Sequence, residues 1–188
     1  PFRDGTILQS VAEAALGAGC RVLVVAGNRA DSIPEALGAC LASFVEVVFN
    51  PHWREGMMGS LQTGMSRVRS TRFFVLPADM PFAPVRAFRE LVREAELRQA
   101  SGLPDAPFFP MFHSMPGHPV LIPSRCIAEA LRLPRGSRFK DFLSARNPVY
   151  LSVEDGGIRK DIDTPGDYER GTVVSRNESM KTCVVLER

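Results

Sequence analysis

The sequence predicts a three-layer, Rossmann-like α/β fold with a mostly parallel sheet. Short apolar runs at 22–26, 45–49 and 73–76 are typical of strands that are covered on both faces. Between these runs, apolar residues recur three and four positions apart, which is the spacing of amphipathic helices. Strands that alternate with helices indicate βαβ crossovers, and such crossovers join parallel strands.

Helices in the first half of the chain are predicted from their apolar faces. The longest ends at residues 101–104, Ser-Gly-Leu-Pro. The first helix precedes every strand, whereas a doubly wound sheet usually opens on a strand. This start predicts either a fold without a phosphate loop or further residues upstream of Pro1. The faces, in chain order, are Leu8, Val11, Ala15 and Leu16; Ala36, Leu37, Cys40 and Leu41; Met58, Leu61, Met65 and Val68; and Val85, Phe88, Leu91, Val92 and Ala95.

The second half of the chain is less regular. Proline and phenylalanine dominate residues 104–123, which predicts a long irregular crossing segment with a strand only at 119–122. Short helices at 127–133 and 139–143 are predicted next. Alternation at 149–153 then predicts an edge strand.

Composition and length bound the class of protein. One domain is expected over residues 1–170, and residues 171–188 form a tail or the start of a further segment. A net charge of only +2 argues against nucleic acid as a partner. No apolar run approaches the roughly 20 residues that span a membrane, and no secretory leader is visible. Scattered cysteines indicate reduced thiols without structural zinc, and hence a cytoplasmic protein.

An acidic residue follows the third apolar run, in Leu76-Pro77-Ala78-Asp79-Met80-Pro81. This position places Asp79 at the carboxyl end of a strand, where ligands bind in open α/β sheets. A carboxylate there suits a Mg²⁺ ion that holds phosphates, because Mg²⁺ takes hard oxygen ligands. The alternative is a turn aspartate between two prolines.

A second candidate segment, residues 50–61, follows the second apolar run and opens a helix. Backbone N–H groups at a helix start bind anions, and Gly56 and Gly59 let a ligand approach the backbone closely. Ser60 is a candidate cap for this helix. The alternative is an ordinary connection between a strand and a helix.

Two further segments are candidates for the same crevice. His118, between a glycine and a proline, is a binding candidate, although a lone histidine is more often a surface or hydrogen-bonded residue. Asp161 and Asp163 lie in an extended segment, and one of them is expected to face Asp79 and share Mg²⁺ with it. The alternative for the segment of Asp161 and Asp163 is a polar edge strand.

Six basic residues crowd one stretch of the chain, and they suit either a solvated face or the binding of a phosphate: Arg125, Arg132, Arg135, Arg138, Lys140 and Arg146.

Four motifs occur together and in order: NPHWREGMMGSL at 50–61, LPADMP at 76–81, GHPVLIP at 117–123 and DIDTPGDY at 161–168. In combination they resemble the MobA-like nucleotidyltransferases, and most of all the branch that contains molybdenum cofactor cytidylyltransferase. The similarity covers about residues 5–170.

The resemblance implies a fold of the glycosyltransferase-A (nucleotide-diphospho-sugar transferase) type and a nucleotidyltransferase activity, EC 2.7.7.-. It implies that Asp79 and Asp163 are the catalytic residues that bind Mg²⁺. It also implies residues that line the nucleotide and acceptor pocket, with the last two bordering the acceptor: Asn50, Gly56, Met57, Ser60, Leu61, Gly117 and His118.

One part of the family pattern is absent from this chain. The family opens on a strand and a loop like LAAGxSxRMGxxK, which holds the triphosphate and supplies a basic residue. Gly5-Thr6-Ile7-Leu8 resembles the segment just after that loop. We therefore expect about 20 residues upstream of Pro1, since a doubly wound sheet without its first strand leaves neighbouring strands unpaired.

The implied reaction moves a nucleoside monophosphate, from CTP in preference to GTP, to the terminal phosphate of molybdopterin and releases pyrophosphate. A molybdoenzyme would receive the finished cofactor. No general base is required, because the second pKa of a phosphate monoester lies near 6. The alternatives are an enzyme specific for GTP or a sugar phosphate, and a non-catalytic nucleotide-binding module of a longer protein.

Overall fold

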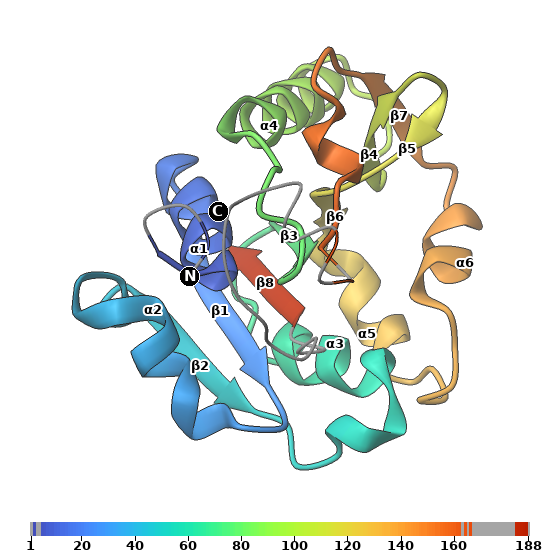
Figure 1. The fold of residues 1–188 in the computed structure, drawn as a ribbon. Helices are drawn as coiled ribbons and strands as arrows, with labels where there is room; N and C mark the ends of the chain where they lie inside the picture. The colour runs from blue at the N-terminus through green and yellow to red at the C-terminus, as the bar shows by residue number, and fades with distance from the viewer. Residues whose placement is uncertain (1, 3–4, 163, 165, 167–182, 188) are drawn as a thin grey trace.

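The structure, a computed structural model, describes residues 2, 5–162, 164, 166 and 183–187 (Figure 1). Its helices are α1 (Ile7–Gly17), α2 (Ile33–Ala42), α3 (Met57–Met65), α4 (Val85–Ala100), α5 (Ile127–Ala130) and α6 (Phe139–Ser144). Its strands are β1 (Arg21–Ala26), β2 (Val45–Phe49), β3 (Arg72–Pro77), β4 (Phe108–Phe112), β5 (Met115–Pro116), β6 (Val120–Pro123), β7 (Val149–Ser152) and β8 (Cys183–Glu187). The 3₁₀ turns η2 (Trp53–Glu55) and η4 (Gly156–Arg159) lie in two of the connections.

The strands form one mixed sheet of eight strands in the order β2-β1-β8-β3-β6-β4-β5, with β7 beside β4. Only β1–β2 and β4–β7 are parallel pairs among the described strands, so the prediction of a mostly parallel sheet is wrong. The βαβ inference holds for β1 and β2, which α2 joins. It fails for later strands because an apolar run shows that a strand is buried but not which way it runs.

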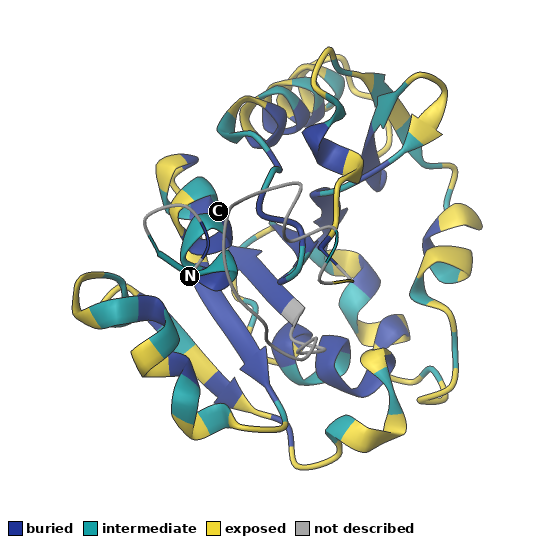
Figure 2. Cartoon of the chain, viewed as in Figure 1, coloured by how far each residue is buried: buried dark blue, intermediate teal, exposed yellow. Residues whose placement is uncertain are grey.

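Helices pack on both faces of the sheet, as a three-layer fold requires (Figure 2). α1, α2 and α4 share one core with Val22 and Val24 of β1. α3, α5 and α6 share the other core with Leu23 and Val25, because successive strand residues point to opposite faces. Among the described residues, no helix has both the length and the apolarity needed to cross a bilayer.

Residues 104–123 contain paired strands, which corrects the expectation of an irregular crossing. β4 pairs with β5, β6 and β7, and β6 pairs with β3. Phe108 and Phe109 enter the two cores from opposite faces of β4. Pro110 lies inside this strand, and its carbonyl accepts a hydrogen bond from the Gly117 N–H at 2.8 Å. Aromatic burial on both faces therefore outweighs the weakening effect of the proline.

β8 occupies the centre of the sheet although it comes last in the chain. It pairs antiparallel with β1, as in Val24↔Val184, and with β3, as in Val75↔Val185. The strand falls within residues 171–188, which the sequence sets apart as a tail. Strands β1 and β3 are thus each hydrogen-bonded to β8.

Gly64 of α3 packs directly on the centre of the sheet. An ideal Cβ at this residue would lie 2.4 Å from Val185 Cγ2 and 3.0 Å from Val25 Cγ2. Both neighbours are buried, so we expect Gly64→Ala to lower the free energy of unfolding by about 1–3 kcal/mol through overpacking. Urea unfolding measures the loss. Gly136→Ala is the control, because nothing lies within 4 Å of its Cβ position; equal midpoints for both variants would contradict this packing.

Candidate active site

Two of the predicted site residues, Asn50 and Asp79, stand just beyond the ends of β2 and β3. β1 and β2 are parallel, and both β1 and β3 oppose β8, so the three strands point the same way. Asn50 follows β2 directly, and Asp79 stands two residues after Pro77, the last residue of β3. Ligands of α/β sheets bind outside such carboxyl ends.

Residues 157–162 hold the turn that carries Asp79. The Ile162 N–H donates to the Asp79 carbonyl oxygen at 2.9 Å. Gly157 lies against the same turn, and an ideal Cβ there would sit 2.2 Å from the Phe82 carbonyl oxygen. Asp79 is half-buried, whereas Asp163 lies outside the described residues. Residues 79 and 162 are thus neighbours in space, as a metal ion shared between the two segments requires.

The turn of Gly117 and His118 rests on the same segment. The His118 N–H donates to the Ile158 carbonyl oxygen at 2.8 Å, and the ring Nδ1 lies 3.3 Å from the Val75 carbonyl oxygen. Burial lowers the pKa of His118; the bond to Val75 opposes this shift, and the charge of Lys140 adds to it. His118 is therefore a neutral imidazole near pH 7, which positions the turn but attracts no phosphate by charge.

Asn50 and Ser60 form a buried pair behind the start of α3. Asn50 Nδ2 donates to Ser60 Oγ at 3.0 Å, and Asn50 Oδ1 accepts from the His52 N–H at 3.0 Å. Both residues are buried. The proposed capping role of Ser60 is wrong, because α3 begins at Met57 and Gly56 stands at its N-cap. The pair instead fixes the shape of the β2–α3 loop.

The other predicted residues of this loop differ in exposure. Gly56 has a φ of +106°, a left-handed conformation that favours glycine, and makes the turn into α3. Met57 is 54% exposed, whereas Leu61 is buried in the core beneath α3. Met57 therefore offers a surface to a ligand, and Leu61 seats the helix.

Arg135 also reaches the start of α3, and the sequence did not distinguish it from its basic neighbours. Its Nη1 lies 2.9 Å from Glu55 Oε2 and would lie 3.8 Å from a Cβ on Gly59. Glu55 Oε1 lies 2.8 Å from His52 Nδ1. Only the fold brings Arg135 to this helix, so no spacing along the chain could have revealed it.

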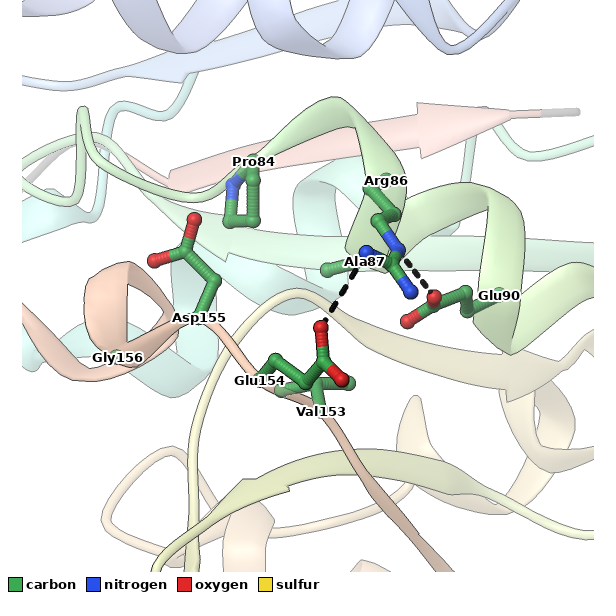
Figure 3. A pocket seen from close by; sticks show the side chains of 8 residues that line it. All are labelled: Pro84, Arg86, Ala87, Glu90, Val153, Glu154, Asp155 and Gly156. Atoms are coloured by element: carbon green, nitrogen blue, oxygen red, sulfur yellow. Dashed lines mark hydrogen bonds and ion pairs between the residues drawn. The ribbon is translucent and has the colours of Figure 1, made fainter.

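A larger and a smaller cavity lie beyond the Asp79 turn, toward α1 and α4. The larger, about 710 Å³, lies between α1 and residues 81–85. The smaller, about 360 Å³, lies between the start of α4 and residues 153–156 (Figure 3). Beside the smaller cavity, Arg86 pairs with Glu90 of the same helix at 2.6 Å, and across it with Glu154 at 3.5 Å. None of the predicted site residues that the structure describes lines either cavity.

Comparison with known families decides the class of this protein, since residues 1–149 match the MobA-like NTP transferase domain. The chain belongs to this family. The molybdenum cofactor cytidylyltransferase of Escherichia coli (strain K12) is 27% identical over 168 residues, which are 89% of this chain and 82% of that protein. The predicted membership of the MobA-like nucleotidyltransferases is therefore confirmed.

Solved structures share the fold of this MobA-like domain. Rv0371c from Mycobacterium tuberculosis H37Rv superposes with a TM-score of 0.74 at 23% identity, over 90% of this chain and 85% of that one. The complex of Rv0371c with manganese superposes with a TM-score of 0.72 at 22% sequence identity, over 91% of this chain and 88% of that one. A homolog of Rv0371c from Mycobacterium sp. strain JC1 superposes with a TM-score of 0.68 at 19% sequence identity, over 90% of this chain and 83% of that one. At these identities the likeness establishes the fold alone.

Proposed function

We propose that this MobA-like domain transfers a nucleoside monophosphate, preferably from CTP, to the phosphate of molybdopterin and releases pyrophosphate. The position of Asp79 carries the proposal: it follows β3 at the ligand-binding edge, with the Ile162 N–H on its carbonyl oxygen. Family membership supports nucleotidyl transfer. The cytidylyltransferase of E. coli, at 27% identity, supports CTP and molybdopterin as the substrates.

A divalent cation fits the donor type at this edge. Mg²⁺ in phosphate-binding enzymes is usually held by one or two carboxylates, with phosphates and water as the other ligands. Asp79 offers one carboxylate beyond the end of β3, which suits an open site of this kind. Asp163 remains the proposed second ligand. The manganese complex of a structural neighbour supports a divalent ion, which when bound would neutralise charge on the phosphates.

The residues of the chain would bind and orient the two anionic substrates. The acceptor phosphate is ionised near pH 7, so no side chain has to remove a proton. Arg135 brings a cation to the start of α3, and guanidinium groups match phosphate oxygens. Rate enhancement would therefore come from alignment and from screening of the repulsion between two anions.

Pyrophosphate release with reduced molybdopterin and each of the four nucleoside triphosphates tests this function. We expect Mg²⁺-dependent turnover that is fastest with CTP and is abolished by EDTA. Faster turnover with GTP, or with a sugar phosphate as acceptor, would reassign the specificity. Nucleotide binding without pyrophosphate release for any acceptor would support the alternative, a nucleotide-binding module without catalysis.

A further inference from the structure

Gln62, on α3, is bonded to the segment that leaves α5. The amide nitrogen of its side chain lies 3.1 Å from the carbonyl oxygen of Ala130, 3.3 Å from that of Leu131 and 2.8 Å from that of Leu133. A side-chain amide carries two N–H donors, so the three carbonyl groups share them. Carbonyl groups at the end of a helix have no partner in a following turn, and α5 spans only four residues. Gln62 therefore ties the end of α5 to α3.

The segment beyond α5 then follows one side of α3 toward the start of that helix. Residues 56, 59 and 62 are spaced three apart, so they lie on the same side. A Cβ on Gly56 would lie 3.9 Å from the Arg135 carbonyl oxygen, and a Cβ on Gly59 would lie 3.8 Å from Arg135 Nη1. The two glycines thus leave room for Arg135, and Gln62 holds the segment one turn farther along α3.

A second contact orients the guanidinium group of Arg135. Its Nη1 lies 2.9 Å from Glu55 Oε2, and the Arg135 side chain is 40% exposed. A guanidinium group carries five N–H donors, so this contact leaves others for a ligand. Phosphate oxygens fit those donors, because the planar fork of arginine matches phosphate geometry. Gln62 thus holds the main chain near Arg135, and Glu55 holds one edge of the guanidinium.

We propose that Gln62 is a positioning residue for the transfer reaction. By holding the carbonyl groups that follow α5, it keeps Arg135 beside the start of α3, where the guanidinium binds a phosphate group of a substrate. That phosphate belongs to the nucleoside triphosphate or to the acceptor, which share this chemistry. The role rests on the proposed function, because it requires a phosphorylated substrate at this end of α3. Gln62 itself contacts neither substrate.

Amide hydrogen exchange tests the tether without any substrate. Gln62→Leu removes the N–H donors at a similar size, so the segment after α5 should open more often. The N–H groups of Leu133 and Ser137 bond within this segment, and we expect them to exchange at least about tenfold faster in the variant. Gln99→Leu is the matched control, since Gln99 lies on α4 and bonds to Arg72. Unchanged exchange in Gln62→Leu would overturn the proposal.

A double-mutant cycle with Arg135→Gln tests what the tether does. KM and kcat for CTP and for reduced molybdopterin are measured for the wild-type protein, both single variants and the double variant. We expect Gln62→Leu to raise the KM of one substrate at least about fivefold with little change in kcat, and to raise it no further in the Arg135→Gln background. The substrate whose KM rises carries the phosphate that Arg135 binds. Equal effects of Gln62→Leu in both backgrounds, or an unchanged KM for both substrates, would overturn the positioning role.

Binding of inorganic pyrophosphate separates this proposal from the proposed function. Calorimetric titration in the presence of Mg²⁺ requires no turnover and no identified acceptor. We expect the dissociation constant to rise at least about fivefold in Gln62→Leu and in Arg135→Gln, and to stay at the wild-type value in Gln99→Leu. Absence of pyrophosphate release with every substrate pair would reject the proposed function but leave this titration decisive. Equal dissociation constants for the wild-type protein and Gln62→Leu would overturn the role of Gln62.

Discussion

Asp79→Asn is expected to lower the rate of pyrophosphate release at least about 10³-fold. This loss corresponds to a rise of about 4 kcal/mol in the activation free energy. Asparagine keeps the size of the side chain but lacks the negative charge that a divalent cation requires. The substitution leaves in place the Asp79 carbonyl oxygen that accepts from the Ile162 N–H, so we expect the variant to fold and to unfold in one cooperative transition. Steady-state pyrophosphate release and thermal unfolding test these two expectations.

Asp161→Asn is the matched control for this loss. Asp161 is exposed, and Asp163 rather than Asp161 is the proposed second metal ligand. We expect this variant to turn over at about the wild-type rate. Near-normal turnover of Asp79→Asn, or an equal loss in both variants, would reject Asp79 as a metal ligand.

Gly157→Ala is expected to reduce both stability and turnover although it removes no functional group. An added Cβ would lie 2.2 Å from the Phe82 carbonyl oxygen and 3.0 Å from Asp155 Oδ1. The first neighbour is backbone, so residues 157–162 must move away from the Asp79 turn. We expect the free energy of unfolding to fall by about 2–3 kcal/mol. We also expect the rate of pyrophosphate release to fall at least about tenfold, because small displacements of groups in an active site slow a reaction strongly.

Gly136→Ala again provides the comparison, since its Cβ position is open. Urea unfolding and pyrophosphate release of the two variants are measured side by side. Wild-type values for Gly157→Ala in both assays would show that the close contact between η4 and the Asp79 turn does not position the site.

Local periodicity was sufficient to predict the elements of the first half. The faces that begin at Leu8 and Val85 appear as α1 and α4, and the run at 73–76 appears as β3. Each of these signals depends on residues within one or two turns of each other. The position of Asp79 at a strand end followed from the same local pattern.

Strand order and direction could not be predicted because they depend on contacts between distant segments. Residues 171–188, expected to be a tail or the start of a further segment, gave no sign that β8 would lie between β1 and β3. The prolines of residues 104–123 masked β4, whose burial on two faces is a property of the assembled sheet. In the site, the same limit hid the Asn50–Ser60 pair and the approach of Arg135 to α3.

Titration with Mn²⁺ in the presence of a non-hydrolysable CTP analogue, followed by electron paramagnetic resonance, tests the role of Asp79 most directly. We expect one nucleotide-dependent Mn²⁺ site in the wild-type protein and in Asp161→Asn, and its loss in Asp79→Asn. Identical Mn²⁺ binding by the wild-type protein and Asp79→Asn would contradict the claim that Asp79 holds the cation that presents the nucleotide.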